Sequence, residues 1–166
     1  MNHSRKSVAT FLSLLLLICI ISAVAAAQSK SKKNQYACAE ANPESLCNVQ
    51  NTCGSESEPC VVEIKRTADS VKVQASIAEP KSKVFCLKPG TKVTFKTTSK
   101  NTGFLVDFGP DAPFDQTDAI SGGSSRETTV IAQKSGCYNF SVGACVSGAI
   151  SGMCRSVQRE AVVMSK

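Results

Sequence analysis

The sequence contains almost no histidine. The 166-residue chain contains one histidine, His3, and it lies in an N-terminal segment that we expect to be removed. Without an imidazole, a Ser-His-Asp or Cys-His nucleophile system has no general base, so both classes of enzyme are excluded. No other catalytic pair is marked by the remaining sequence, which favours a protein that is not an enzyme and that holds no cofactor.

Cysteine pairs at close spacing are also missing. Consecutive cysteines are separated by at least five residues, whereas zinc knuckles use C-x₂₋₄-C and dithiol oxidoreductases use C-x-x-C. Basic residues are not interleaved with aromatic ones, so nucleic-acid binding is not expected. The stretch Gly122–Ser125 lacks the lysine and the spacing of a phosphate-binding loop, and we expect a flexible turn there.

The N-terminus has the pattern of a secretory signal peptide. Arg5 and Lys6 precede an apolar run, Phe11–Ile21, and the small residues Ala23–Ala27 offer A-x-A cleavage sites. We predict a signal peptide over residues 1–27 and a secreted or periplasmic protein that meets the membrane only transiently, through this segment. An uncleaved anchor is the alternative, because the apolar stretch approaches the roughly 20 residues that a spanning helix needs.

The chain that remains after cleavage contains an even number of cysteines. They are Cys38, Cys47, Cys53, Cys60, Cys86, Cys137, Cys145 and Cys154. In an exported chain this set predicts four disulfides. Local spacing favours Cys145 with Cys154 and Cys53 with Cys60, while a bridge between strands from Cys86 to Cys137 is a further possibility that the sequence leaves open.

Past the signal peptide the chain divides into two parts. Residues 28–60 are expected to form a flexible leader and a loop-rich, cysteine-rich segment held by its own bridges. In residues 61–166, short alternating or β-branched stretches predict strands near residues 71–77, 84–87, 93–96, 104–108, 128–132, 138–142 and 161–164. A long polar connection, Gly109–Glu127, separates two of them. Because no stretch has a helical stripe, we predict an all-β sandwich of seven or eight strands.

Three pieces of the chain carry a resemblance to a known family. They are Val84–Phe95 with its Pro-Gly corner, Phe104–Phe108, and Gly136–Val142 followed by Gly152-Met153. From Val71 to Met164 the sequence resembles the cupredoxins, the blue-copper family. The resemblance implies a cupredoxin-like, Greek-key β-sandwich, to which this chain adds the cysteine-rich N-terminal extension.

The same resemblance implies that the copper site has been lost. A blue-copper centre needs two imidazoles and a thiolate, with a weak axial thioether. Phe104 stands at the first histidine position, Val142 at the cysteine position and Cys145 at the second histidine position, so only Met153 keeps a ligand role. Phe104 and Val142 are typical core residues. We therefore expect the former metal end to be closed by side-chain packing.

Four carboxylates offer a different metal. Asp107, Asp111, Asp115 and Asp118 crowd a proline-rich loop, and hard oxygen donors on a flexible loop suit Ca²⁺. A glycosidase acid/base pair would also need two carboxylates, at a defined separation. The plain alternative is a solvated loop, since aspartate favours turns.

Together these features predict an exported, disulfide-stabilised, metal-free module for binding or structure. Its expected surface is the former metal end, formed by the loops Gly109–Glu127 and Gly143–Arg155, and its partner a protein or a polysaccharide. Two alternatives stay open: copper binding or electron transfer through Cys145, Met153 and Cys154, and a calcium-stabilised binding domain. Free thiols at the two cysteines would favour the copper alternative.

Overall fold

The computed structural model of the chain describes residues 38, 41–55, 57–79, 82, 84–116, 118–147 and 154–165. The predicted signal peptide, residues 1–27, and the possible ligand Met153 lie outside these ranges, so both stay predictions. Across the described part of the chain, no helix is long and apolar enough to cross a membrane.

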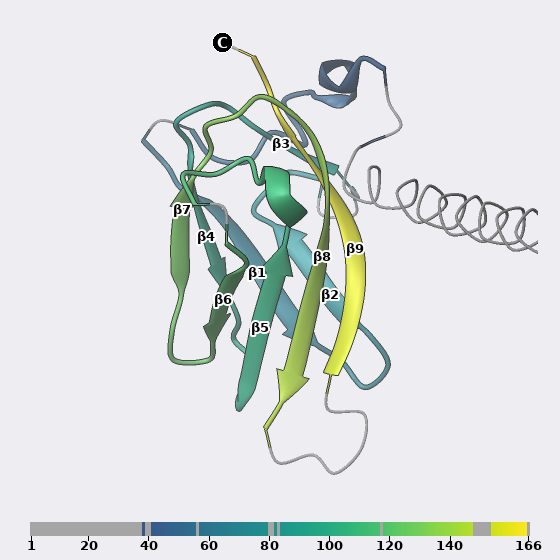
Figure 1. Ribbon diagram of the computed structural model, residues 1–166, viewed down its shortest axis with the longest axis vertical. Helices are drawn as coiled ribbons and strands as arrows, with labels where there is room; N and C mark the ends of the chain where they lie inside the picture. Colours follow the sequence, from purple (N-terminus) through teal and green to yellow (C-terminus); the bar gives the residue numbers. More distant parts are fainter. Residues whose placement is uncertain are drawn as a thin grey trace, which may run out of the picture. The chain divides into compact units, whose positions relative to one another are not determined.

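Short strands make up most of the described chain (Figure 1). In chain order they are β1 (Cys60–Arg66), β2 (Val71–Ala75), β3 (Val84–Leu87), β4 (Lys92–Lys96), β5 (Thr102–Asp107), β6 (Ile120–Gly123), β7 (Thr128–Ile131), β8 (Gly136–Val146) and β9 (Cys154–Val163). Two 3₁₀ turns, η1 (Pro43–Leu46) and η2 (Gly109–Asp111), complete the described elements.

The strands form two sheets, one of four strands in the order β2-β1-β4-β7 and one of five in the order β3-β9-β8-β5-β6. Both sheets are mixed, because β1 pairs with β4 and β3 pairs with β9 in parallel while the other pairs are antiparallel. The chain crosses repeatedly from one sheet to the other, since strands β3, β5 and β6 alternate in sequence with β4 and β7. The prediction of an all-β sandwich is confirmed, with nine strands in the described residues instead of the predicted seven or eight.

Five phenylalanines connect the two sheets through the core. The rings of Phe108 and Phe140 stack with centroids 4.5 Å apart, and Phe85 meets Phe140 edge-on at 6.0 Å. Phe114 meets Phe108 at 5.0 Å and Phe95 at 6.0 Å, both edge-on. Such pairs contribute about 0.5–1.5 kcal/mol each beyond the area they bury. The segment after β5 is therefore anchored in the core by two of its own rings.

Two predictions about the strands need correction. The predicted flexible turn at Gly122–Ser125 overlaps β6, which is hydrogen-bonded to β5. Glycine and serine have low strand propensity, so the pairing with β5 and not the local sequence forms this strand. The last strand begins at Cys154 and not at Ala161, because ten antiparallel register pairs hold it against β8.

Four disulfides tie the molecule together, and two of them are the predicted local pairs, Cys53–Cys60 and Cys145–Cys154. The other two are Cys47–Cys86 and Cys38–Cys137. The expectation that the cysteine-rich segment is held by its own bridges is thus wrong in part. Two of its cysteines attach it to β3 and β8 of the sandwich.

The possible Cys86–Cys137 bridge is also wrong, and the register explains why. Both cysteines lie opposite Val162, one on each side of β9. Neighbouring strands are about 4.8 Å apart, so two cysteines on either side of a third strand are separated by roughly 10 Å. A disulfide needs Cα atoms within about 7 Å of each other.

Candidate functional site

The residue at the first ligand position of the resemblance, Phe104, is a packing residue. It lies in the middle of β5, opposite Gly122 of β6, and only 5 % of its surface is exposed. A Cβ atom placed on Gly122 would lie 2.3 Å from Cζ of the Phe104 ring. The ring therefore occupies the space that a side chain at position 122 would need, and this part of the sandwich is closed.

The next two ligand positions are also occupied by structural groups. Val142 on β8 is fully buried, with Val106 and Val157 opposite it on the two neighbouring strands. Cys145 is bonded to Cys154, so no thiolate is present at either residue. A phenyl ring, an isopropyl group and a disulfide thus stand where two imidazoles and a thiolate would be required.

The four aspartates of the predicted calcium site do not assemble one. Among the described residues, which include all four, no three His, Cys, Asp or Glu side chains form a group that could hold a metal ion. The Asp107 carboxylate accepts a hydrogen bond from the Gly109 N–H at 2.8 Å, and the Asp115 carboxylate accepts one from Ile131 at 2.9 Å. The Asp107 bond therefore fixes the turn after β5, a common role of aspartate, whereas the Asp115 bond connects the loop to the end of β7.

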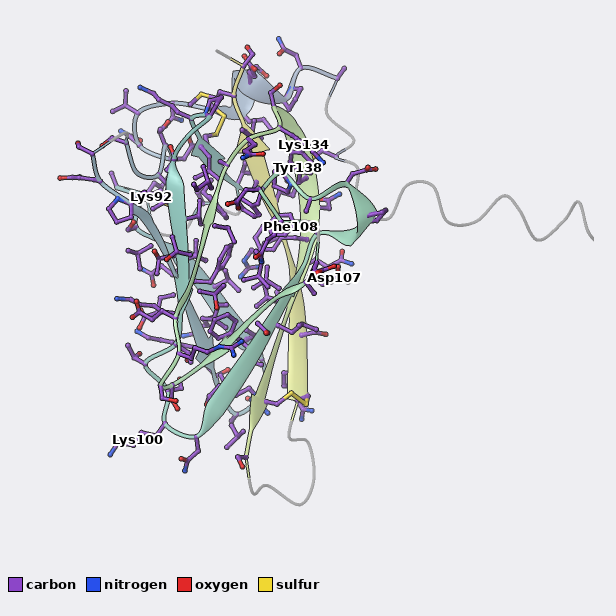
Figure 2. All side chains as sticks on the ribbon, turned by 60° about the vertical axis from the view of Figure 1, so that its left-hand side comes forward. Lys92, Lys100, Asp107, Phe108, Lys134 and Tyr138 are labelled. Carbon is purple, nitrogen blue, oxygen red and sulfur yellow. A yellow bond between two sulfur atoms is a disulfide. The ribbon has the colours of Figure 1, made fainter. Side chains whose placement is uncertain are left out.

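A half-buried tyrosine, Tyr138, lies near the loop that carries these aspartates. The Tyr138 hydroxyl on β8 donates to the carbonyl oxygens of Lys134 and Ser135, at 3.1 and 3.3 Å. Burial raises the pKa of the Tyr138 hydroxyl, and the negative charge of Asp111 adds to the rise. In Figure 2, Tyr138 is labelled in the upper part of the molecule and Asp107 lower down, near its middle.

The two loops proposed as one binding surface share one end of the sandwich only in part. β5 starts beside Val146 of β8 and ends beside Ser141, so the segment that follows β5 begins away from the β8–β9 connection. The turn after β6 returns to that end, where the Ser124 N–H donates to the Thr102 carbonyl oxygen at 3.0 Å. The loop Gly109–Glu127 is divided by a strand that was not predicted, β6, and residues 148–153 of the second loop lie outside the described residues, so the shared surface stays a prediction.

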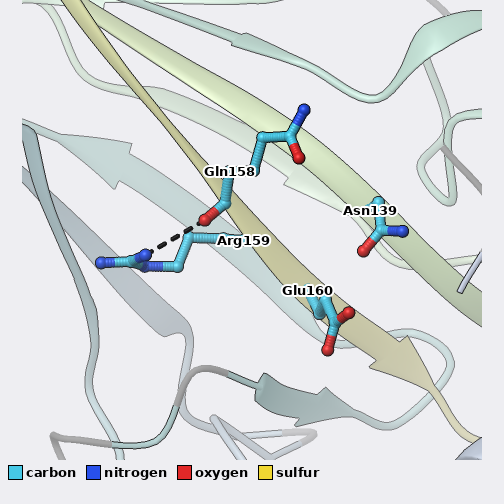
Figure 3. A pocket seen from close by; sticks show the side chains of 4 residues that line it. All are labelled: Asn139, Gln158, Arg159 and Glu160. Carbon is cyan, nitrogen blue, oxygen red and sulfur yellow. Dashed lines mark hydrogen bonds between the residues drawn. The ribbon is translucent and has the colours of Figure 1, made fainter. Parts of the chain in front are cut away.

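A polar pocket of about 180 Å³ lies on β8 and β9 instead (Figure 3). Its lining residues are Asn139, Gln158, Arg159 and Glu160. Asn139 and Glu160 face each other across the two strands, and Arg159 donates to the Gln158 carbonyl oxygen at 3.0 Å. Amide and carboxylate groups here provide both donors and acceptors. The sequence did not predict this pocket, because the last strand was expected to begin after Glu160 and begins at Cys154.

The outer face near the start of β5 is nearly bare of side chains. Leu105 is 48 % exposed there, with Gly143 opposite it on β8, and Gly103 lies opposite Cys145. A Cβ atom on Gly103 would have its nearest neighbour at 3.7 Å, and one on Gly143 at 3.9 Å. Packing within the chain therefore does not require either glycine, and both leave the Cys145–Cys154 bridge uncovered on this side.

Comparison with known proteins gives distant likenesses only among solved structures, since no protein-family model and no curated protein matches the chain. A Cu(I) methionine-to-alanine mutant of amicyanin is 14 % identical with a TM-score of 0.36, over 64 % of this chain and 82 % of that one. Pseudoazurin from Methylobacterium extorquens AM1 is 21 % identical with a TM-score of 0.37, and the match covers 66 % of this chain and 77 % of pseudoazurin. A chain of a heme-copper terminal oxidase dimer is 14 % identical with a TM-score of 0.32, and the match covers 96 % of this chain and 99 % of the oxidase chain.

Proposed function

We propose that this cupredoxin-like sandwich is an exported, metal-free binding module that recognises a polar ligand. The observation that carries the proposal is the filling of the ligand positions. Phe104 and Val142 are buried in the core, and Cys145 is disulfide-bonded to Cys154. A metal would have to displace packed side chains to enter here, at a cost typical of core disruption, several kcal/mol.

The disulfides support the exported part of the proposal. Four bridges in one small domain are typical of oxidising compartments and rare in the cytosol. They also replace the stabilisation that a bound metal would give, since each bridge contributes about 2–4 kcal/mol by restricting the unfolded chain.

The binding surface that we assign is the polar pocket on β8 and β9. Gln158 and Glu160 occupy alternate positions of β9 and therefore project from the same face of the sheet. The backbone that carries these amide and carboxylate groups is fixed, because ten register pairs hold β9 to β8. Such fixed donors and acceptors suit a hydroxyl-bearing ligand, and a polysaccharide segment is the partner that we favour over a protein.

The first experiment measures metal and thiol content. We expect the mature protein, purified from the secreted or periplasmic fraction, to contain no stoichiometric copper or calcium and no free thiol. Intensely blue material with one copper per chain would overturn the proposal. Calcium removal by a chelator should leave the thermal unfolding midpoint unchanged, and a clear drop would favour the calcium-stabilised alternative.

The second experiment tests the pocket. Soluble cell-wall oligosaccharides added to ¹⁵N-labelled protein should shift the amide signals of β8 and β9, and the variant Gln158→Ala/Glu160→Ala should abolish the shifts. Ser156→Ala is the matched control, because Ser156 lies on the same strand but does not line the pocket. Shifts that persist in the double variant, or shifts confined to another face, would refute this binding surface.

Copper handling is the second candidate, and the geometry of one bridge favours it. Cys145 and Cys154 lie opposite each other with Cα atoms 4.0 Å apart, so reduction would leave two thiols side by side, and thiolates prefer Cu(I). Reduced protein that takes up one Cu(I) in competition with a chelator, and loses it on Cys145→Ser, would support this candidate over the first.

A further inference from the structure

One disulfide differs from the others in its exposure. Cys145 and Cys154 are both exposed, whereas every cysteine of the other three bridges is buried or half-buried. A thiolate must approach a sulfur atom directly in order to attack it, so access decides which bridge of a folded protein reacts. The Cys145–Cys154 bridge is thus the accessible one of the four.

The strands around this bridge leave its sulfur atoms uncovered. On the β5 side the residue opposite Cys145 is Gly103, which has no side chain. On the other side, β3 pairs with β9 only from Glu160 onward, so within the described residues no strand lies beside Cys154. Within the described residues, an incoming thiolate can therefore approach the bridge over the outer face above Gly103 and along the unpaired edge of β9 at Cys154.

The fold does not depend on this bridge to keep the two cysteines together. Cys145 and Cys154 are the last of ten register pairs between β8 and β9, and the ladder continues as far as Gly136 and Val163. The other three bridges lie elsewhere on the sandwich. Reduction would leave two thiols facing each other on a preserved hairpin, ready to form the bond again.

One cation lies beside the backbone of Cys154. The Arg155 guanidinium donates from Nη1 to the Cys154 carbonyl oxygen at 3.3 Å, although the two side chains leave β9 on opposite faces. A neighbouring cation stabilises a thiolate, and the better-stabilised thiolate leaves faster in disulfide exchange. Attack at Cys145 with departure of Cys154 is the favoured direction.

We propose that the Cys145–Cys154 bridge is a thiol–disulfide exchange site whose substrate is a dithiol on another exported molecule. A substrate thiolate attacks Sγ of Cys145, the bond between Cys145 and Cys154 breaks, and its electron pair leaves on Sγ of Cys154. The second substrate thiol loses its proton and attacks the mixed disulfide. The substrate leaves as a disulfide, Cys145 and Cys154 become a dithiol, and two electrons have moved from substrate to protein.

Limited reduction followed by alkylation tests the site in the full mature chain. We expect a small excess of reduced thioredoxin, used as a dithiol probe, to reduce only the Cys145–Cys154 bridge. Peptide mass mapping should then find the alkyl label on these two cysteines alone, and the far-ultraviolet circular dichroism should be unchanged. Simultaneous opening of all four bridges, or earlier opening of any other bridge, would overturn the proposal. Reduced glutathione in a parallel reaction distinguishes the sources: equal rates per thiol indicate small-molecule thiols, and a much faster reaction with thioredoxin indicates a protein partner.

Two arginine variants test the direction of attack. Arg155→Gln should slow reduction of the bridge at least about three-fold, because the departing thiolate on Cys154 loses its cation. Arg159→Gln is the matched control, since Arg159 donates in the same way to the carbonyl oxygen of the preceding residue, Gln158, but lies away from the bridge. Equal slowing in both variants, or none in Arg155→Gln, would refute the assigned role of Arg155.

Discussion

Substitution of Gly122 by alanine is the sharpest test of how the Phe104 ring packs against β6. The added Cβ atom would lie 2.3 Å from Cζ and 2.7 Å from Cε1 of Phe104, and 2.7 Å from the Arg126 carbonyl oxygen. Carbon atoms in contact prefer about 3.5–4.0 Å, so the ring would have to move by more than about 1 Å. The Arg126 carbonyl cannot yield easily, because it accepts a hydrogen bond from the Gly123 N–H at 2.9 Å.

The expected cost follows from overpacking. Inserting one carbon into a filled core typically costs about 1–3 kcal/mol. Gly103→Ala is the matched control on the neighbouring strand, where the nearest atom to the new Cβ is a backbone oxygen at 3.7 Å. A glycine-to-alanine change without strain stabilises by about 0.4–1 kcal/mol, through the unfolded chain. The two variants should therefore differ by about 2 kcal/mol or more, with Gly122→Ala the less stable.

Urea unfolding with the disulfides intact measures both variants. A double-mutant cycle with Phe104→Leu, which removes the ring atoms nearest to the new Cβ, should show a coupling of about 1 kcal/mol or more between the two positions. Equal midpoints for Gly122→Ala and Gly103→Ala, or a coupling near zero, would show that the Phe104 ring does not fill this space.

Three further perturbations test other parts of the structure. Replacing Cys47 and Cys86 by alanine should cost about 3–4 kcal/mol in urea unfolding, because this bridge closes a separation of 39 residues. The raised pKa of Tyr138 keeps its hydroxyl neutral in the folded state, so stability should fall as the pH rises above about 10, and Tyr138→Phe should flatten that loss in alkaline unfolding curves. Hydrogen bonds from Thr98 and then Lys65 lower the pKa of Glu63, so its stabilisation is present above about pH 4.3 and is lost as the pH falls through the lower folded value. Thr98→Val should raise the pKa of Glu63 in an NMR titration and weaken this acid dependence.

Periodicity was enough to find the strands that bury one face. The alternation in β2, β4 and β8 and the apolar run in β3 are local signals, and the structure has strands at these places. The identity of Phe104 and Val142 as core residues was equally readable, since both are large or branched apolar side chains and both are buried. Local composition therefore predicts several strands of the sandwich and two of its core residues.

Strand pairings and disulfides between residues far apart in the chain could not be predicted from the sequence. β6 has the composition of a turn and becomes a strand only because β5 pairs with it. The bridges of Cys38 and Cys47 join residues 99 and 39 positions apart, and their choice depends on the position of β9 between β3 and β8. The order of strands in a sheet decides such pairings, and spacing along the chain does not reveal that order.

The contrast between Gly122 and Cys145 shows where this limit lies. Cys145 and its partner stand on two strands that are consecutive in the chain, so a short spacing sufficed to predict their bond. The need for glycine at position 122 is evident only once Phe104, eighteen positions earlier, is known to lie opposite it. The Phe104 ring fills the space that a Cβ atom would occupy. A glycine in a strand lowers stability by roughly 0.5–1 kcal/mol relative to alanine unless a neighbour uses the space. Two features therefore differ in how they can be predicted: the absence of copper ligands at Phe104 and Val142 is visible in residue identities, and the filling of the space beside Phe104 requires the pairing of β5 with β6.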